Sequence, residues 1–265
     1  MMKFLQIASG KEFLATSMHY PDSLFPVEEI PIVIICHGFI STRIGIDRLF
    51  VQTAHYLASR GMLVVRFDYA GCGESSGEYG DNRLEDLIDQ TRSVIDYVKN
   101  IESFKNNPII LLGHSLGGAV ALLTATIDTR VDSLILWAPS ANPYDDITRI
   151  VRTQTKISNL DGSIDYCGYR LGSHFFESLS HYHPLQEAKK FPGNVLVVHG
   201  TNDEVIPVEY CDSYDQAFKF RKKGNCEKEV IAGANHTFSS LLHRQILLQI
   251  TSDWLEKELS LIETN

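Results

Sequence analysis

Short apolar runs alternate with segments of helical period along most of the chain. Runs rich in β-branched residues, typical of strands buried on both faces, occur at 30–36, 62–67, 108–112, 133–137 and 194–198. Between them, apolar residues recur every three or four positions over 47–60 and 83–100, which predicts amphipathic helices. This alternation predicts an α/β fold with a mostly parallel central sheet flanked by helices.

The two ends of the chain add elements of a different kind. Residues 3–7 and 12–19 are predicted to pair as antiparallel strands before the parallel region. Residues 227–231 are predicted to form the last strand, and residues 237–259 a long closing helix. No internal repeat or low-complexity linker interrupts this order.

One segment, from residue 140 to residue 191, breaks the alternation between two core strands. It is rich in Asp, Tyr, His and Gly, and it is too long for an ordinary connection. We expect it to be an inserted lid over the carboxyl edge of the sheet, where α/β sheets bind ligands. The core domain would then comprise residues 1–139 and 192–265.

Composition and charge narrow the classes of partner. The 265 residues, 44% of them hydrophobic, can bury one sizeable core. With a net charge of −9 and no long run of Lys or Arg, we expect no nucleic acid and no membrane as partners. No stretch approaches the about 20 apolar residues of a bilayer span, and no signal-peptide core is present. Five scattered cysteines are typical of reduced thiols, so we expect a cytoplasmic protein.

The strongest chemical signal is Gly113-His114-Ser115-Leu116-Gly117, which directly follows one predicted strand and directly precedes a predicted helix. So sharp a turn needs small residues two places before and two places after the serine, because a side chain there would strike the neighbouring backbone. The turn would hold the Ser115 hydroxyl at a helix N-terminus, which favours developing negative charge. We therefore predict that Ser115 is a nucleophile.

An acid and a base follow Ser115 in the sequence. Asp203 lies just past the predicted strand 194–198, and His236 lies in the loop between the last strand and the last helix. In such a set, His236 takes the proton of Ser115 and returns it to the leaving group. Asp203 fixes the tautomer of the imidazole and stabilises its charged form.

Alternatives exist for several of these residues. Asp145 and Asp146, past the strand 133–137, are rival acids, and Asp203 could merely cap the helix that follows it. His181 and His183 form an HxH pair in the inserted segment, which we interpret as surface residues rather than ligands. No CxxC or HExxH pair is present, so we expect no metal and no cofactor.

His37-Gly38-Phe39 follows the predicted strand 30–36. A loop of this type supplies one backbone N–H to a tetrahedral intermediate, and the residue after the nucleophile supplies the other. We predict that these oxyanion-hole donors are Phe39 and Leu116. A Gly-x-Gly stretch within 68–77 also follows a strand, but its third glycine falls one place late for a dinucleotide site. We interpret it as a structural loop beside the active site.

Together these motifs resemble the α/β-hydrolase superfamily over nearly the whole chain. The matching landmarks are HGF at 37–39, DYAGCGES at 68–75, GHSLGG at 113–118, HGTNDEVIP at 199–207 and GANHTF at 233–238. Within the superfamily, the chain resembles the bacterial serine esterases grouped with monoglyceride lipases and serine aminopeptidases, including the cinnamoyl (feruloyl) esterases of gut bacteria. The resemblance implies an α/β-hydrolase fold with a short lid, and a serine esterase that cleaves hydroxycinnamate and other small aryl or short-chain acyl esters.

The leading hypothesis is a hydrolase of small carboxylic esters, as a monomer or homodimer, that works through an acyl-Ser115 intermediate. The same triad could instead cleave an amide, a peptide or a thioester, or transfer the acyl group to an alcohol. A ligand-binding protein with low turnover is a third hypothesis, which the intact set of residues disfavours. Four aromatic residues could line an acyl or aryl pocket, or could form the lid's own small core: Tyr166, Tyr169, Phe175 and Phe176.

Overall fold

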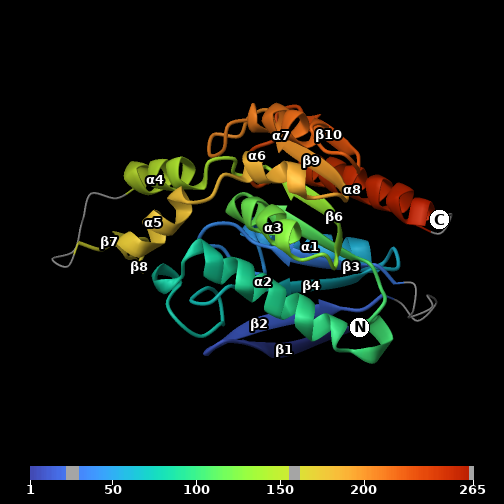
Figure 1. Ribbon diagram of the computed structural model, residues 1–265, viewed down its shortest axis with the longest axis horizontal. Coiled ribbons are helices and arrows are strands. Elements are labelled where there is room, and N and C mark those ends of the chain that lie inside the picture. Colours follow the sequence, from blue (N-terminus) through green and yellow to red (C-terminus); the bar gives the residue numbers. More distant parts are fainter. Residues whose placement is uncertain (22–29, 155–161, 263–265) are drawn as a thin grey trace.

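The computed structural model describes residues 1–21, 30–154 and 162–262, and a single eight-stranded sheet runs through it (Figure 1). The strand order is β1-β2-β4-β3-β5-β6-β9-β10. The pairs β1/β2 and β2/β4 are antiparallel, and all other neighbours are parallel. The predicted mostly parallel sheet of an α/β-hydrolase fold is therefore confirmed. Its strands are β1 (Met2–Ser9), β2 (Glu12–His19), β3 (Ile32–Cys36), β4 (Leu63–Phe67), β5 (Ile109–His114), β6 (Val131–Trp137), β9 (Asn194–Gly200) and β10 (Cys226–Ile231).

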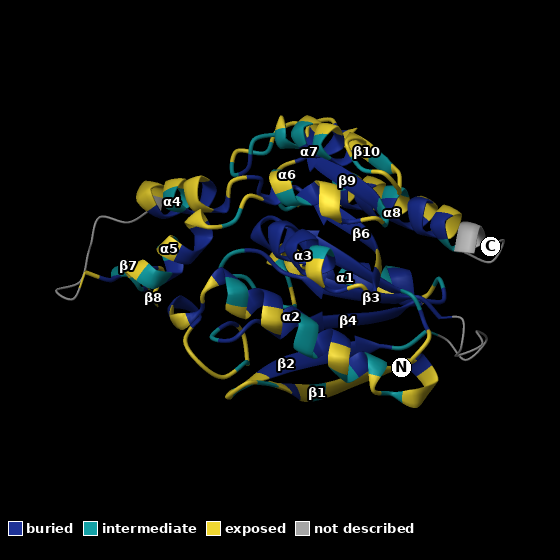
Figure 2. Cartoon of the chain, in the orientation of Figure 1, coloured by how far each residue is buried: buried dark blue, intermediate teal, exposed yellow. Residues whose placement is uncertain are grey.

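Each central strand sends alternate side chains to two hydrophobic layers. In β3, Ile32 and Ile34 belong to one layer, and Val33 and Ile35 belong to the other. Both faces of these strands are buried (Figure 2), which explains why continuous apolar runs marked them in the sequence. The first layer is covered by α2 (Leu84–Lys99), α3 (Leu116–Ile127) and α7 (Tyr210–Lys219), and the second by α1 (Leu49–Ala58) and α8 (Leu241–Ile262).

Two helices begin later than their apolar patterns predict. Helix α1 starts at Leu49, because Asp47 and Arg48 adopt left-handed backbone conformations, with φ of 52° and 62°. Helix α8 starts at Leu241, because Phe238 has a φ of 49° and its N–H closes a turn on the Asn235 carbonyl. Within the described ranges, no helix has both the length and the apolar character of a membrane span.

Between β6 and β9, the described elements within residues 140–180 lie at one end of the molecule, and the segment that follows them runs back beside α3 and α7 (Figure 1). Ile150 and Tyr166 from this group line the same cavity as Ser115, so the segment borders the carboxyl edge of the sheet. Part of it, residues 155–161, lies outside the described residues, and its role as a lid stays a prediction. Its elements are α4 (Pro143–Gln154), β7 (Ile164–Tyr166), β8 (Tyr169–Leu171), α5 (Ser173–Ser180) and α6 (Pro184–Glu187).

Candidate active site

Ser115 occupies the sharp turn between β5 and α3. Its backbone has a φ of 58° and a ψ of −125°, a conformation that a non-glycine residue adopts only when its surroundings enforce it. The Ser115 N–H donates to the Trp137 carbonyl at 2.9 Å, and the Ser115 carbonyl accepts the Gly118 N–H at 2.9 Å. The turn therefore holds Ser115 at the first turn of α3, with only 5% of the residue exposed.

The glycines around Ser115 are required by close approach of the backbone. A Cβ on Gly113 would lie 2.3 Å from the carbonyl oxygen of Gly117, and a Cβ on Gly117 would lie 2.2 Å from that of Cys36. A Cβ on Gly38 would lie 3.0 Å from the Cβ of Ser115, so the loop after β3 packs directly against the serine. These contacts give the steric reason for the Gly-x-Ser-x-Gly spacing.

The loops after β9 and β10 bring Asp203 and His236 together. The His236 Nδ1 bonds to Asp203 Oδ2 at 2.7 Å, and Asp203 Oδ1 accepts the N–H groups of Val205 and Ile206, each at 2.8 Å. Burial by itself would raise the pKa of Asp203, but hydrogen bonds from His199 and His236 outweigh it and hold the pKa well below its usual value. An ionised Asp203 keeps the proton of His236 on Nδ1, which leaves Nε2 free to accept one.

A second histidine, which the sequence analysis did not assign to the site, shares this carboxylate. His199, fully buried in β9, donates from Nε2 to Asp203 Oδ2 and to the Ile206 carbonyl, both at 3.1 Å. Two imidazoles therefore flank one carboxylate oxygen. The sequence feature that could have pointed to His199 is its position, near the end of a buried strand and four residues before the acid.

His114 ties the nucleophile turn to the histidine loop. Its Nε2 donates to the His236 carbonyl at 2.8 Å, and the two rings lie 4.7 Å apart between centroids. Burial, followed by the neighbouring His236, lowers the pKa of His114 to about 3, so the ring is neutral near pH 7. Among the described residues, no hydrogen bond joins the Ser115 hydroxyl to His236. Such pairs often tighten only when substrate binds.

Ser115 and His236 line one cavity of about 690 Å³. The loop after β3, the turn after β5 and the loops after β9 and β10 surround it, and α4 and β7 close another side. Its wall combines polar groups near the serine with apolar side chains, which suits a ligand that has both a reactive polar group and an apolar body. The apolar lining residues include Phe39, Ile46, Leu49, Phe50, Ile150, Tyr166 and Val205.

The loop that carries Phe39 is held by His37. The His37 Nδ1 bonds to the Gly38 carbonyl at 2.8 Å, and its Nε2 accepts the Tyr69 N–H at 3.0 Å. Burial lowers the pKa of His37 to about 4, which keeps the ring neutral and able to accept this bond. In the described part of the chain, the amides of Phe39 and Leu116 donate to no other group. Their assignment as oxyanion-hole donors stays a prediction.

The glycine-rich stretch after β4 folds around a buried carboxylate. Asp68 is fully buried and accepts the Glu74 N–H at 3.0 Å, while a Cβ on Gly73 would lie 2.1 Å from Asp68 Oδ2. Asp68 also bonds the backbone N–H and the guanidinium of Arg43, in the loop that follows Phe39. This arrangement agrees with a structural loop that braces the neighbouring active-site loop.

The structure separates the four aromatic residues expected at the substrate. Tyr166 lines the Ser115 cavity, but Tyr169, Phe175 and Phe176 are not among its lining residues. Phe175 is fully buried and stacks on Phe39, with centroids 5.8 Å apart, while Tyr169 lies edge-on to Tyr79 at 6.3 Å. Phe176 packs edge-on to Phe175 at 5.4 Å. These three residues form the packing behind Phe39 and Tyr166.

The rival acids lie on α4 and have different partners. Asp145 is exposed, whereas Asp146 is buried and accepts hydrogen bonds from the Ser140 hydroxyl at 2.6 Å and the Tyr210 hydroxyl at 3.4 Å. Arg149 bonds to Asp146 at 3.1 Å and to the Val205 carbonyl at 2.8 Å. No histidine bonds to Asp146 within the described residues, so the structure brings His236 to Asp203 and not to this carboxylate.

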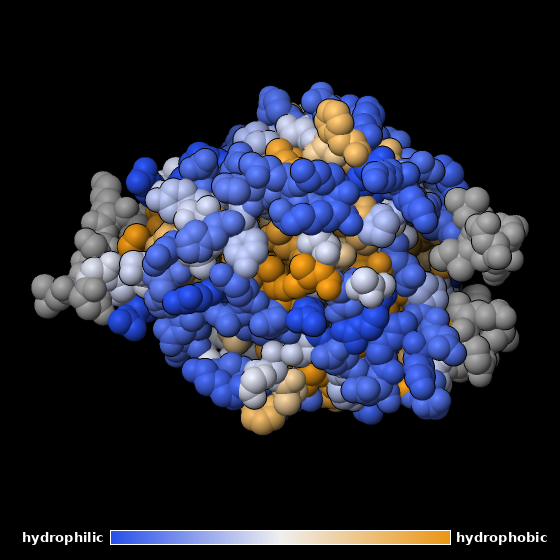
Figure 3. Space-filling view, viewed as in Figure 1, coloured by the Kyte–Doolittle hydropathy of each residue, from blue (hydrophilic) through white to orange (hydrophobic). Residues whose placement is uncertain are grey.

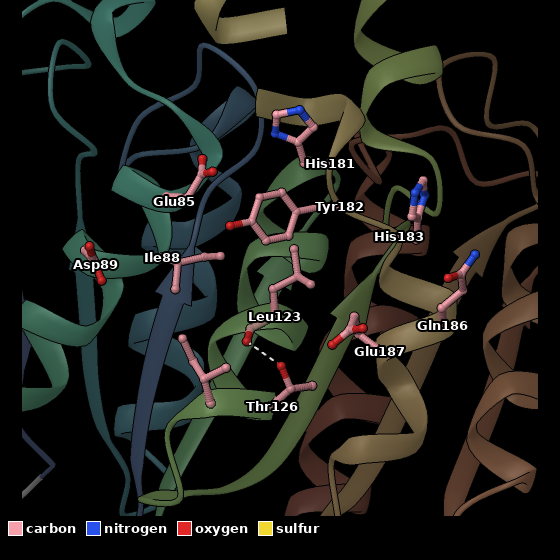
Figure 4. Close-up of a pocket in the computed structure, with 11 residues that line it drawn as sticks. Glu85, Ile88, Asp89, Leu123, Thr126, His181, Tyr182, His183, Gln186 and Glu187 are labelled. Atoms are coloured by element: carbon pink, nitrogen blue, oxygen red, sulfur yellow. Dashed lines mark hydrogen bonds between the residues drawn. The ribbon is translucent and has the colours of Figure 1, made fainter. Parts of the chain in front are cut away.

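A second cavity, of about 480 Å³, lies apart from Ser115 between α2, α3 and the segment that begins α6 (Figure 4). His181 and His183 line it, on either side of Tyr182, and Figure 3 shows apolar surface in the middle of this face. Within the described ranges, no group of three or more His, Cys, Asp or Glu side chains is arranged to hold a metal ion. The position of the two histidines agrees with their interpretation as surface residues.

Comparisons of the sequence place these features among known proteins. Residues 28–161 match the profile of the serine aminopeptidase S33 family. A monoglyceride lipase homologue of Monkeypox virus is 25% identical over 216 residues, which cover 70% of this chain and 75% of that protein. A lysophosphatidylserine lipase of Xenopus tropicalis, ABHD12, is 36% identical over 117 residues, 42% of this chain and 28% of that protein. Two matched Escherichia coli proteins of unknown function are each covered over only 36% of their length.

Solved structures of similar fold cover almost the whole chain. Est1E from Butyrivibrio proteoclasticus, with bound ferulic acid, superimposes with a TM-score of 0.82 at 24% identity, over 97% of this chain and 99% of that one. Mouse α/β-hydrolase domain-containing protein 10 gives a TM-score of 0.72 at 22% identity, over 97% and 99%. At these identities the likeness establishes the fold.

Proposed function

This chain belongs to the serine aminopeptidase S33 family of α/β hydrolases, and we propose that it hydrolyses small carboxylic esters through an acyl-Ser115 intermediate. One observation carries the proposal. The ionised Asp203 holds His236 by Nδ1 at 2.7 Å, and His236 lines the same cavity as Ser115. A serine on a strained turn, beside an oriented imidazole, is the arrangement that acyl transfer requires.

The reaction would proceed in two halves. His236 Nε2 accepts the Ser115 proton as the oxygen attacks the ester carbonyl, and the tetrahedral intermediate expels the alcohol, which takes that proton from His236. Water then gives a proton to His236 as it attacks the acyl-Ser115 carbonyl. The second tetrahedral intermediate releases the acid when the bond to the Ser115 oxygen breaks and that oxygen takes the proton back from His236. Asp203 stays ionised throughout and stabilises the imidazolium of each half.

Negative charge on the carbonyl oxygen would be stabilised by the main-chain amides of Phe39 and Leu116. The packing of Gly38 against Ser115 supports this assignment, because it brings the loop after β3 within reach of the reacting carbon. The amide of Leu116 begins α3, so the helix dipole adds to its effect. Each donor of this kind contributes about 10²–10³ in rate.

The cavity supports a small acyl or aryl ester as substrate. Phe39 and Tyr166 lie 5.4 Å apart between ring centroids and offer an aromatic wall, to which Ile150 adds an aliphatic surface. A hydroxycinnamoyl group fits this chemistry, as does a short alkyl acyl group. The proposed natural substrate is therefore an uncharged ester with a compact apolar acyl group.

Labelling and turnover together test the proposal. The wild-type protein should release a burst of nitrophenol from p-nitrophenyl acetate and should bind a fluorophosphonate stoichiometrically, whereas Ser115→Ala should do neither. Comparing methyl ferulate with a monoacylglycerol and an aminoacyl anilide would rank ester against amide chemistry. Failure of the folded wild-type protein to become acylated by any of these compounds would refute the proposed function.

A further inference from the structure

Aliphatic side chains are exposed at two segments that lie far apart in the sequence. In the loop after β3, Ile44 is 49% exposed and Ile46 is 57% exposed. At the start of α8, Leu241 and Leu242 are 77% and 63% exposed, and Ile246 is 37% exposed one turn later. Of the thirteen large hydrophobic side chains that are exposed in the described part of the chain, five belong to these segments. We call Ile44, Ile46, Leu241, Leu242 and Ile246 the apolar collar.

The apolar collar borders the mouth of the Ser115 cavity. Ile46 itself lines the cavity. Ser240 and His243, the residues on either side of Leu241 and Leu242, also line it. The exposed leucines therefore lie at the rim, while their neighbours in sequence face the space that holds Ser115.

A buried arginine joins the two halves of the collar. Arg244 is 5% exposed and donates from one guanidinium nitrogen to the Asp47 carbonyl at 3.0 Å and to the Gln52 side chain at 3.2 Å. Helices α1 and α8 also share one hydrophobic layer, on the face of the sheet opposite α2 and α3. The fold consequently holds the two halves of the collar next to each other.

The backbone beside Ile46 is strained. Asp47 and Arg48, which follow it, both have positive φ, and neither is a glycine. Consecutive residues in this region cost free energy and persist only where the surrounding structure enforces them. Here the enforced turn leaves Ile46 projecting at the cavity rim instead of packing into the core.

The position of the collar limits what can cover it. Contiguous exposed apolar surface usually marks a docking site. A second copy of the chain seated on the collar would stand across the path from solvent to Ser115. The surface of an aggregated substrate would instead lie against the entrance of the cavity. A single substrate molecule could then pass from the aggregate into the cavity without exposing its apolar surface to water.

Charge indicates what kind of surface this is. The exposed charges beside Ile46 are Asp47 and Arg48, which oppose one another, and the whole chain carries a net charge of −9. Neither the balanced pair beside Ile46 nor the negative net charge favours binding to an anionic surface. The expectation of no membrane partner rests on that argument from charge, and it does not apply to an apolar contact with an uncharged or zwitterionic surface.

We propose that the apolar collar docks the protein on the uncharged or zwitterionic surface of an aggregated ester amphiphile, from which single molecules enter the Ser115 cavity. Docking is a property of the collar and needs no catalysis. Only the fate of the docked ester rests on the proposed function. The substrate class is thereby extended from dissolved small esters to esters presented at an interface.

Binding is tested first, with the Ser115→Ala protein and phosphatidylcholine vesicles, so that turnover plays no part. The double variant Leu241→Gln/Leu242→Gln should lower the affinity for vesicles, measured by co-sedimentation, at least about tenfold. The reason is that the two leucine side chains no longer gain the free energy of transfer from water to the apolar surface. The matched control, Ile127→Gln with Phe220→Gln, changes two side chains that are 60% and 83% exposed outside the collar, and it should bind as the parent does. Absence of vesicle binding, or equal loss in both pairs, would overturn the proposal.

Activity is tested with tributyrin across its solubility limit and with dissolved p-nitrophenyl acetate. The wild-type rate on tributyrin should rise several-fold once droplets form, and the Leu241→Gln/Leu242→Gln protein should lose this rise while its rate on the dissolved ester stays within about twofold. A rise that the substitutions leave intact would overturn the proposal. The proposal would also be overturned if light scattering showed that the Leu241→Gln/Leu242→Gln substitutions convert a dimer to a monomer while vesicle binding stays unchanged. A protein that binds vesicles but cleaves neither ester would refute the proposed function and support docking.

Discussion

Two buried aspartates at the carboxyl edge of the same sheet have opposite surroundings. Asp203 follows β9 and Asp146 follows the neighbouring strand β6, and their side chains are 0% and 2% exposed. Imidazoles bond to Asp203, whereas hydroxyl groups and a guanidinium bond to Asp146. Burial and position are shared, so the partners decide the role. A carboxylate bonded to imidazoles can orient a base, while one bonded to hydroxyl groups and an arginine anchors a helix.

The largest expected effect comes from removing the charge of Asp203. Asp203→Asn should lower kcat by about 10⁴, because an amide can hold the His236 ring in the wrong tautomer. Asp146→Asn and the exposed Asp145→Asn serve as matched controls and should keep most of the activity. The measurement is kcat on p-nitrophenyl acetate, with thermal unfolding to confirm folding. If Asp146→Asn were the inactive protein, the comparison would be reversed.

We expect a smaller decrease in kcat when Asp203 keeps its charge but loses its hydrogen bond from His199. His199→Leu should lower kcat by about 10- to 100-fold, which corresponds to the about 1.5–3 kcal/mol of a hydrogen bond to a charged group. His199→Gln retains an N–H at a similar distance and should recover much of the rate. The acidic limb of kcat/KM should move to higher pH in His199→Leu, because Asp203 then holds the protonated His236 ring more tightly. An unchanged limb would indicate a purely structural role.

We expect acid to lower the free energy of unfolding through the buried His114, which bonds to the loop that carries His236. The folded pKa of His114, about 3, lies below the ordinary value, so between about pH 6.5 and pH 3 the unfolded chain binds a proton that the folded chain does not. Stability from this group is therefore lost as the pH falls, by about 2 kcal/mol at pH 5. Urea unfolding at pH 7 and pH 5 measures the loss, which should shrink in His114→Gln but not in the exposed His181→Gln. Equal losses in all three proteins would exclude His114 as the cause.

The smallest effect concerns the link between the two regions. Arg149 bonds to Asp146 and to the carbonyl of Val205, whose N–H bonds to Asp203. Since the Arg149 side chain is 45% exposed, Arg149→Met should cost less than about 1 kcal/mol of stability and lower kcat/KM only about twofold. Denaturant unfolding and steady-state rates measure both quantities. A loss as large as that of Asp203→Asn would mean that the two aspartates act as one unit.

The periodicity of the chain was sufficient to predict the inner parallel strands β3, β4, β5, β6 and β9, because both faces of these strands are buried and leave a continuous apolar run. It predicted helix ends less well. Asp47, Arg48 and Phe238 interrupt apolar patterns with positive φ, and such a conformation follows from neighbouring loops rather than from the residue type. The motifs pointed to Ser115 and His236 by their places on strands and loops, and the structure brings both to one cavity.

Residues 140–191 show where prediction from sequence ended. Their aromatic residues are equally compatible with a pocket and with a small core, and only the packing separates Tyr166 at the cavity from Phe175 behind it. His199 was missed for a related reason. A lone histidine in an apolar strand is usually a core residue, and its bond to Asp203 depends on how the following loop folds back.

The sequence by itself determined the order of the core strands and helices, the glycine spacing around the nucleophile and the family, because these depend on local sterics and on which faces are buried. Tertiary structure decided which carboxylate meets the imidazole, which aromatic ring reaches the cavity, and that two segments with exposed aliphatic side chains, remote from each other in the sequence, both border the cavity. Each of these is a contact between segments remote in the chain, and such a contact exists only after the sheet has aligned the carboxyl ends of its strands.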